Sequence, residues 1–360
     1  MDKKKIFRIV LAAVNIIIFA VVGLCILKIH KLAQESLSGS ASRAWKEDSP
    51  TEYSDVTIFY HPVLGMDIPS AYSMHKKVEE RLIKDSAIPK EKSDNRLWID
   101  CASGEFSGTV CNGNVKTEAQ ICTTWGDYFV FHPEELISGY YYDKDNANFD
   151  VIVLDDIASW RLFGGLDTVG LEVTINGRTF HVTGVVRSPT DKISQRAYGK
   201  DPHVYIPADA VGLIESNASL NIYELCVPDK VRDYALTISK ELAPEQSEIG
   251  NVIDQTNRFD LITLVKSHGL IPESAMVNAG FSYPWWENVT RAAELQARII
   301  SYPCALALLV PAITLIYLLF AAVKGIGRLF RFIWSKIDDI HQKKLKRRYE
   351  QLKAASEHQG

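Results

Sequence analysis

Two long stretches without a charged side chain constrain this chain of 360 residues more than any other feature. Nineteen residues from Ile9 to Leu27 and twenty-five from Ile299 to Val323 carry no charge. An α-helix rises about 1.5 Å per residue, so about 20 apolar residues cross the roughly 30 Å hydrocarbon layer of a membrane. We therefore predict transmembrane helices at residues 9–29 and 299–323.

The first stretch also has one feature of a cleaved signal peptide, because four basic residues precede it. The apolar core of a signal peptide usually has about 7–15 residues, and this stretch is longer. The small residues that resemble a cleavage site, at 38–42, follow only well past the core. A retained membrane anchor is the interpretation that we favour.

Charge is distributed unevenly along the chain and predicts its orientation in the membrane. The N-terminus at residues 1–8 has four basic residues, and the segment 324–360 has ten Lys and Arg against four Asp and Glu. Between Ile9 and Val323 there are 26 basic and 39 acidic residues. Because Lys and Arg collect on the cytoplasmic side of a membrane, we expect both termini to be cytoplasmic and the middle to be extracytoplasmic.

The near-neutral total charge of −4 hides this asymmetry and gives no indication of nucleic-acid binding. The basic tail at 324–360 also contains Leu, Ile, Phe and Trp. Such a segment is suited to anionic lipid of the inner leaflet, or to contact with a cytoplasmic protein.

The segment between the two stretches has the pattern of an α+β domain. Leu171–Ile175 and Phe180–Val186 alternate in hydrophobicity around Asn176-Gly177, which predicts a β-hairpin with a two-residue turn. Further strands are expected at 56–60, 95–100, 151–154, 203–206 and 222–227. Helices are expected at 73–85, 157–163 and 229–241, the last with Asp229 as its N-cap.

The chain therefore divides into seven predicted segments. They are a cytoplasmic N-terminus at 1–8, a membrane helix at 9–29, a flexible linker at 30–54, an extracytoplasmic domain at 55–287, a stalk helix at 288–298, a second membrane helix at 299–323 and a cytoplasmic tail at 324–360.

No sequence motif for catalysis is present. The chain lacks a phosphate-binding GxxxxGK[ST] loop, an HExxH metal motif and a GxSxG nucleophile motif. Asp155 and Asp156 are adjacent carboxylates, but at a strand-to-helix turn such a pair usually interacts with the helix N-terminus. We predict no catalytic, cofactor-binding or metal-binding residue.

Four cysteines fall in the predicted outer domain, namely Cys101, Cys111, Cys122 and Cys226. They can form two disulfides in three possible pairings, or they can be free buried thiols, and the sequence leaves both alternatives open.

Three other residues are candidate membrane-site residues. Asn15 is the strongly polar residue of the first stretch, and such residues often mark association between membrane helices. Trp285 and Trp286 precede the second stretch and suit the aromatic belt at a membrane interface.

Several segments, in order, resemble the MacB-like extracytoplasmic core domain of FtsX-like ABC transporter permeases. The similar segments are Ala119–Cys122, Gly126–Phe129, Glu135–Tyr140, Asp150–Leu154, Ala158–Gly164, the Asn176-Gly177 hairpin, Phe180–Val185, His203–Pro207 and Trp285–Asn288. The resemblance covers roughly residues 55–325. It implies a two-lobed mixed α/β domain flanked by two transmembrane helices, with a β-rich inserted lobe at about 104–190.

The resemblance also implies a function. A permease of this family has three spans after the outer domain, and one is predicted here, so we expect a permease-like or accessory subunit in a reduced form. Its implied partners are a cytoplasmic ABC ATPase and a second permease-like membrane subunit. The alternative is a membrane-tethered binding or sensor module without transport activity, and an outer-surface enzyme is the least favoured reading.

Overall fold

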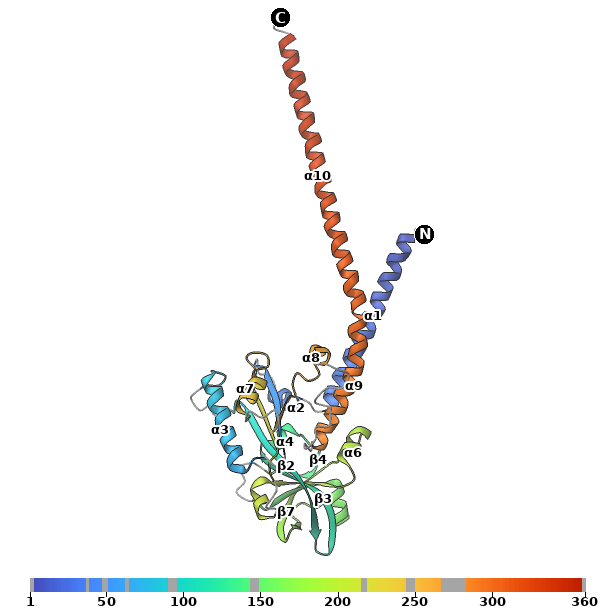
Figure 1. Ribbon diagram of the computed structural model, residues 1–360. Coiled ribbons are helices and arrows are strands. Elements are labelled where there is room, and N and C mark those ends of the chain that lie inside the picture. Colours follow the sequence, from blue (N-terminus) through green and yellow to red (C-terminus); the bar gives the residue numbers. More distant parts are fainter. Residues whose placement is uncertain are drawn as a thin grey trace. The chain divides into compact units, whose positions relative to one another are not determined.

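The computed structural model describes residues 3–36, 39–46, 51–61, 65–89, 96–142, 149–214, 219–243, 250–266 and 283–357 (Figure 1). The chain forms two compact units. One is the central unit, residues 26–301, and the other is the terminal unit, which combines residues 1–25 with 302–360.

The central unit alternates strands and helices. Its strands are β1 (Tyr53–Tyr60), β2 (Ile99–Asn112), β3 (Val115–Gly126), β4 (Leu136–Gly139), β5 (Val151–Asp155), β6 (Glu172–Ile175), β7 (Arg178–Val186), β8 (His203–Pro207), β9 (Ile222–Pro228) and β10 (Gly250–Asp254). Its helices are α2 (Ser40–Lys46), α3 (Ile68–Lys84), α4 (Tyr128–Phe131), α5 (Asp156–Phe163), α6 (Lys192–Tyr198), the 3-10 helix η2 (Ala208–Leu213), α7 (Tyr234–Leu242) and α8 (Leu261–Lys266).

The strands form one mixed sheet in the order β10-β1-β9-β2-β3-β8-β5-β7-β4, with β6 paired to β2 and β7. The pairs β3–β8 and β5–β7 are parallel, and the other pairs are antiparallel. Separate apolar clusters lie along this sheet, one with α3 and α7 and another with α5 and η2. The predicted mixed α/β class is confirmed.

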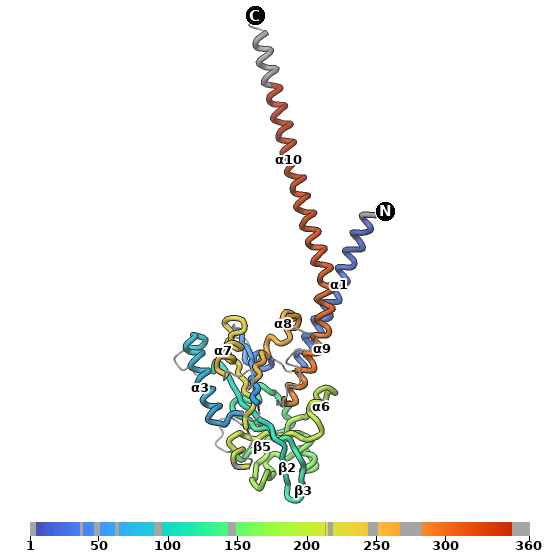
Figure 2. Tube along the Cα trace, viewed as in Figure 1, coloured from blue at the N-terminus to red at the C-terminus, as the bar shows by residue number. Residues whose placement is uncertain are grey.

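Helices α3 and α7 lie beside one another against the first apolar cluster (Figure 2). Helix α3 buries Ala71, Met74, Val78 and Leu82, spaced three or four residues apart as a single buried face requires. It begins at Ile68, five residues before the predicted start, because the side chain of Asp67 caps it by accepting a hydrogen bond from the Ser70 N–H at 2.9 Å.

The adjacent carboxylates Asp155 and Asp156 open helix α5, as the sequence predicts. Asp155 Oδ1 accepts from the Ala158 N–H at 2.6 Å, and Oδ2 accepts from Tyr198 Oη and the His203 N–H, both at 2.8 Å. Through these three contacts Asp155 caps the start of α5 and ties it to Tyr198 of α6 and to His203 at the start of β8.

The predicted hairpin is confirmed as β6 and β7, with Val173 opposite Phe180. Asn176 has φ 48° and Gly177 has φ 82°, so both turn residues are left-handed. This is the backbone that a two-residue hairpin turn requires. The Asn176 side chain also donates to the Ile214 carbonyl at 2.8 Å and ties the turn to η2.

The N-cap predicted for the helix at 229–241 is wrong. Helix α7 begins at Tyr234 after Asp233, whose left-handed backbone (φ 65°) stops the helix from starting earlier. The predicted cap, Asp229, instead accepts a hydrogen bond from Ser54 Oγ at 2.7 Å. The helix therefore begins five residues after the predicted cap.

The linker expected at 30–54 is largely structured among its described residues. Helix α1 (Lys3–Glu35) extends into it, and α2 follows with Ala41 buried. The Ser42 N–H donates to Asp55 Oδ2 at 2.9 Å. A composition rich in small and polar residues indicated a spacer, but small side chains also allow a short helix to pack closely.

The terminal unit contains most of each uncharged stretch. Helix α1 contains the first, and the second is divided between α9 (Trp285–Ala307) and α10 (Leu309–Glu357). The helices separate at Leu308, because Pro311 has no N–H to donate to the Ala307 carbonyl four residues earlier. Both segments contain a window long and apolar enough to cross a membrane.

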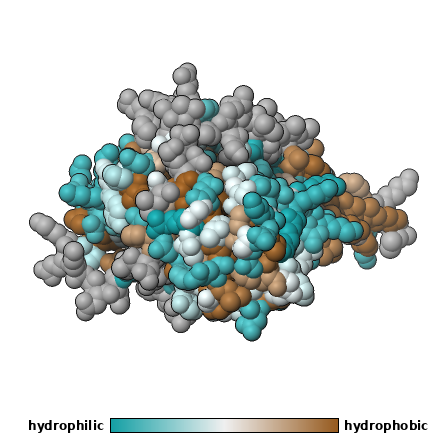
Figure 3. All heavy atoms as spheres, turned by 90° about the horizontal axis from the view of Figure 1, so that it is seen from below, coloured by the Kyte–Doolittle hydropathy of each residue, from teal (hydrophilic) through white to brown (hydrophobic). Residues whose placement is uncertain are grey.

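The surface of the central unit differs from these helices. Its large exposed apolar side chains, such as Tyr72, Leu136 and Val231, are scattered along the sequence. Seen from below, hydrophilic and hydrophobic residues are intermixed over the part drawn in colour (Figure 3). Scattered apolar residues of this kind are normal on a water-facing domain.

The turn geometry makes a prediction about stability. Gly177→Val places a β-branched side chain at φ 82°, which costs about 1–3 kcal/mol of unfolding free energy. Thermal unfolding of the purified chain in detergent measures the loss. Thr179→Val is the control, since Thr179 is exposed in β7 and has ordinary strand geometry. Equal midpoints for both variants would contradict the assigned turn.

Candidate functional site

The first four turns of α9 form the candidate site, which we call the stalk junction. This part of the helix buries charged and hydroxyl side chains that protein interiors seldom accept. They are Glu287, Thr290, Arg291, Glu294, Arg298 and Ser301, each no more than 6% exposed. Residues 287, 291, 294 and 298 recur at helical spacing, so they share one face of α9.

Arg258, in the loop between β10 and α8, pairs with this face. Its Nη1 and Nη2 atoms each donate to a different oxygen of Glu287 at 3.0 Å, and its Nε donates to Glu294 Oε2 at 2.6 Å. Arg298 Nη2 lies 3.6 Å from the other oxygen of Glu294. The guanidinium thus uses a two-pronged contact to hold two turns of α9 at once.

The electrostatics of the pair follow from its burial. Burial alone would lower the pKa of Arg258, but the carboxylates of Glu287 and Glu294 outweigh it and hold that pKa above its ordinary value. Arg258 is therefore a fixed positive charge. Removing one member of such a buried group leaves the others without compensation, which is far more costly than losing a surface ion pair.

Hydrogen bonds continue from α9 into the sheet. Gln255 Nε2 lies 3.2 Å from both Glu287 Oε2 and Thr57 Oγ1, at β1. Thr57 Oγ1 donates to Glu224 Oε1, on β9, at 3.2 Å. His132 Nε2 lies 2.6 Å from Glu224 Oε2. A continuous polar chain therefore joins the stalk helix to two neighbouring strands and to the end of α4.

Apolar contacts complete the stalk junction. Ile29 and Leu32, at the end of α1, pack with Ala293 and Ala297 of α9 and with Leu264 of α8. Alanine at the contact allows the two helix backbones to approach closely.

A hydrogen bond crosses the same contact, because Thr290 Oγ1 donates to the Ser36 carbonyl at 2.9 Å. Both helices that lead to the uncharged stretches are thus held within the central unit.

A small cavity of about 20 Å3 lies beside the stalk junction, lined by Asp55, His132, Glu224, Gln255, Trp286 and neighbouring residues. Asp55 is 4% exposed. Burial raises the pKa of its carboxyl to about 6, although the hydrogen bond from the Ser42 N–H opposes the rise. The cavity wall therefore includes a carboxyl whose charge changes under mildly acidic conditions.

Cys101, Glu224 and His132 meet here but do not form a cysteine nucleophile. The Cys101 thiol lies 3.6 Å from Glu224 Oε2 and is fully buried. Burial first, and the nearby carboxylates next, raise the pKa of this thiol. An activated cysteine needs the opposite, a lowered pKa beside a cation or an imidazole base. Among the described residues no cluster of three or more potential ligands could hold a metal ion.

Cys101, Cys111, Cys122 and Cys226 of the central unit are free thiols in the structure. Cys101, Cys122 and Cys226 are buried, and Cys111 is partly exposed. Cys122 Sγ lies 3.5 Å from Tyr128 Oη, and Cys226 adjoins Asp55.

Trp285 and Trp286 lie at the stalk junction. The sequence predicted that both would lie at a membrane interface. Trp286 is 7% exposed, with its ring centroid 4.2 Å from His132 and 6.0 Å from Phe59. The Trp285 ring meets Tyr198 at 5.1 Å. These rings fill the space between α9 and the domain. Residues 267–282, which precede them, lie outside the described part of the chain.

Asn15 lies in the terminal unit on α1, where its Nδ2 donates to the Leu11 carbonyl at 2.7 Å and to Thr314 Oγ1 of α10 at 3.3 Å. Asn15 was a candidate from the sequence, whereas the buried charges of the stalk junction were not. A usable signal was present in the spacing of Glu287, Arg291, Glu294 and Arg298, because alternating charges on one helical face just before an uncharged stretch indicate a polar partner.

Comparison with known proteins identifies a family. The family described as MacB-like periplasmic core domain matches residues 46–246, more than half of the chain. No curated protein matches the chain in sequence.

Two solved structures are similar to it. The periplasmic region of MacB from Actinobacillus actinomycetemcomitans is 20% identical, with 56% of this chain and 88% of that chain covered and a TM-score of 0.39. The extracellular domain of the noncanonic ABC-type transporter YknZ from Gram-positive bacteria is 14% identical, with 55% and 99% covered and a TM-score of 0.38.

The buried ion pairs predict a large effect of one substitution. Arg258→Met leaves Glu287 and Glu294 buried without their main cation and lowers the unfolding free energy by about 3–5 kcal/mol. Chemical denaturation of the purified chain in detergent measures this loss. Arg232→Met is the matched control, because Arg232 pairs with the exposed Asp260, and such pairs contribute about 0–1 kcal/mol.

A triple variant separates charge from packing. Combining Arg258→Met with Glu287→Gln and Glu294→Gln removes the unpaired charges, so it recovers part of the stability that Arg258→Met loses. A triple variant less stable than the single one would show that charge compensation is not what holds α9.

Asp55 makes a prediction about pH. Its pKa is about 6 in the folded state against an ordinary 3.8, so the folded state binds the proton more tightly. Its stabilising contribution is complete below about pH 4 and is lost as the pH rises through about 6. We expect Asp55→Asn to raise the thermal midpoint relative to the wild type at about pH 7.5, and this difference to shrink towards pH 4.

The control for this measurement is Asp167→Asn, since Asp167 is exposed. Its difference from the wild type stays flat over the same range. A pH-independent difference for Asp55→Asn as well would refute the assignment of the raised pKa to this carboxyl.

Proposed function

Because the chain belongs to the family of MacB-like periplasmic core domains, we propose that it is a subunit of an ABC transporter complex and couples a separate cytoplasmic ATPase to its extracytoplasmic domain. The family is of the ABC transporter permease type. The chain also has two helices suited to crossing a membrane.

The stalk junction is the observation that carries this proposal. Arg258 donates hydrogen bonds to Glu287 and Glu294, in the first and third turns of α9. The same helix enters the uncharged stretch at Ile299. A displacement of α9 must either carry the sheet with it or separate buried charges, and separation costs several kcal/mol. Such a connection suits a protein that transmits movement between a membrane helix and an outer domain.

The proposed topology places both termini in the cytoplasm and the central unit outside the membrane. Its support is the excess of Lys and Arg at 1–8 and 324–360 together with the acidic middle. In this arrangement the second half of α10 is cytoplasmic.

The part of α10 that follows Val323 is also the proposed contact for the ATPase. Ile326, Phe330, Ile333, Ile337 and Ile340 are all exposed and spaced alternately by four and three residues. This spacing produces one apolar seam along a helix, suited to packing against another protein. The basic residues beside it suit anionic lipid of the inner leaflet. A second permease-like subunit completes the proposed complex within the membrane.

Site-specific photocrosslinking in native membranes tests partner and orientation together. A photoreactive amino acid replaces Trp334, which is 66% exposed on α10, and in a separate chain it replaces Val231, which is 70% exposed on the central unit. We expect Trp334 to yield an adduct with an ABC ATPase and Val231 to yield none.

Other adducts would overturn parts of the proposal. Extracytoplasmic proteins captured at position 334 would reverse the topology. A kinase or other regulator captured there would favour the sensor-module alternative. Lipid adducts alone, in repeated experiments, would reduce the tail to a membrane anchor and contradict the coupling function.

A further inference from the structure

Two cysteines of the terminal unit face each other. Cys25 is on α1 and Cys304 is near the end of α9, and both are free thiols in the structure. The two thiols lie within hydrogen-bonding reach of one another, and Cys304 is 5% exposed. Cys25 lies three residues after Val22 and four before Ile29, both buried, so these three side chains share one face of α1.

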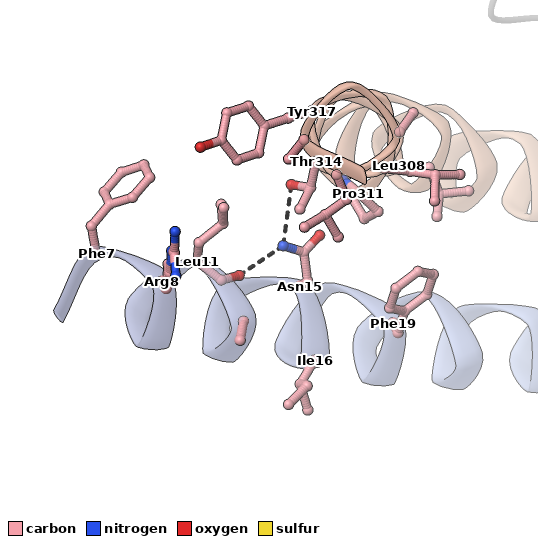
Figure 4. Close-up of a pocket in the computed structure, with 15 residues that line it drawn as sticks. Phe7, Arg8, Leu11, Asn15, Ile16, Phe19, Leu308, Pro311, Thr314 and Tyr317 are labelled. Carbon is pink, nitrogen blue, oxygen red and sulfur yellow. Dashed lines mark hydrogen bonds between the residues drawn. The ribbon is translucent and has the colours of Figure 1, made fainter. Parts of the chain in front are cut away.

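A second contact has the same register. Asn15 Nδ2 of α1 donates to Thr314 Oγ1 of α10 at 3.3 Å (Figure 4). Cys25 follows Asn15 by ten residues, and Cys304 precedes Thr314 by ten. Ten residues make about 15 Å of helix, so two neighbouring helices that run in opposite directions and meet at the first pair meet again at the second. The approach of the thiols therefore follows from the packing of the helices and not from one side-chain rotamer.

The cysteine pair lies at the end of each uncharged stretch that adjoins the central unit in the sequence. Cys25 is two residues before Leu27, the last of the first stretch, and Cys304 is five residues after Ile299, the first of the second. These offsets are about 3 and 8 Å of helix, so the two thiols lie at similar depth. In the proposed topology this end is extracytoplasmic, the side of a membrane on which disulfides form and persist.

We infer that Cys25 and Cys304 form a disulfide that joins α1 to α9 within the membrane. The inference rests on the orientation proposed above. Both S–H bonds break and one S–S bond forms, and the two protons and two electrons pass to a lipid-soluble quinone, which leaves as the quinol. A quinone dissolves in the hydrocarbon layer, whereas a charged oxidant is excluded from it.

Other roles fit the cysteine pair less well. Two thiols are too few for a structural zinc site, which has four ligands, and no group of three or more potential ligands occurs in the described part of the chain. A thiol is a weak donor and a weak acceptor, so serine at either position would make the stronger hydrogen bond. A disulfide to a second chain would require a thiol to turn away from the one that it already faces.

Peptide mapping of the chain from native membranes tests the inference, because each stretch is one tryptic peptide with one cysteine. Cleavage after Arg8 and Lys28 releases the first, and cleavage after Arg298 and Lys324 releases the second. The membranes are treated with an alkylating reagent in denaturant and are digested without reductant. We expect the two peptides to be recovered mainly as one linked species, and the four cysteines of the central unit to be alkylated.

A shifted cysteine is the matched control. Combining Cys25→Ala with Leu24→Cys keeps the number of thiols, but it turns the thiol about 100° around α1, to a position that is 67% exposed. We expect the linked species to be lost in this variant. The reduced wild type, incubated in detergent with a short-chain quinone without oxygen, should lose two thiols and yield one quinol per chain, whereas the shifted variant should yield none.

Several results would overturn the inference. They are free thiols at both positions in native membranes, a link of either cysteine to another chain, or equal linking in the wild type and the shifted variant. A linked pair in membranes without quinol formation in detergent would overturn the assigned oxidant.

The outcome is separable from that of the proposed function. If position 334 captures an ATPase while both thiols are free, the disulfide is wrong and the function stands. If the disulfide is present and no ATPase is captured, the function fails and the disulfide stands.

Discussion

The buried contact of Arg258 with Glu287 and Glu294 is the constraint on which the central unit depends. Helix α9 has a charged face where a soluble helix would have an apolar one, and this face is inserted in the domain. The carboxylates of this face are tolerated there because Arg258 pairs with both of them, and Gln255 and Arg298 add further polar contacts to the group. Any shift of α9 by one turn would break several of these contacts together.

Helix α9 has two parts with different compositions, one buried in the central unit and one within the uncharged stretch. Its first four turns contain charges matched to Arg258, and from Ile299 onward the sequence has no charge at all. The first part is specified by polar geometry and the second by hydrophobicity alone. Asn15 of α1 is an exception among the uncharged stretches, since it places one hydrogen-bonding group in an apolar sequence. A group of that kind selects partners by chemistry in a place where apolar packing alone discriminates poorly.

Much of the fold is predictable from sequence, because its elements are specified locally. The hairpin at Asn176-Gly177, the strands β5, β8 and β9 and the two uncharged stretches all follow from short periodic patterns or from length. The start of α7 does not, because the left-handed backbone of Asp233 sets it. The charge spacing on α9 indicates a polar partner for that helix but not which residue supplies it. Arg258 and Glu294 are 36 residues apart, and no local pattern indicates that a loop arginine will be buried against a helix.

The stalk junction holds α9 with charged side chains although apolar side chains could also hold a buried helix. Buried ion pairs are often no more stabilising than well-packed apolar side chains, so stability alone does not explain them. The neighbouring contact of α1 with α9 through Ala293 and Ala297 shows the alternative. A contact made by small apolar residues has a similar energy in several registers of the two helices. The bidentate contact of Arg258 with Glu287 can form in only one register. Under the coupling function that we propose, a helix free to slide would lose a displacement at this contact. A helix fixed by Arg258 would transmit it through Gln255 to Thr57 of β1.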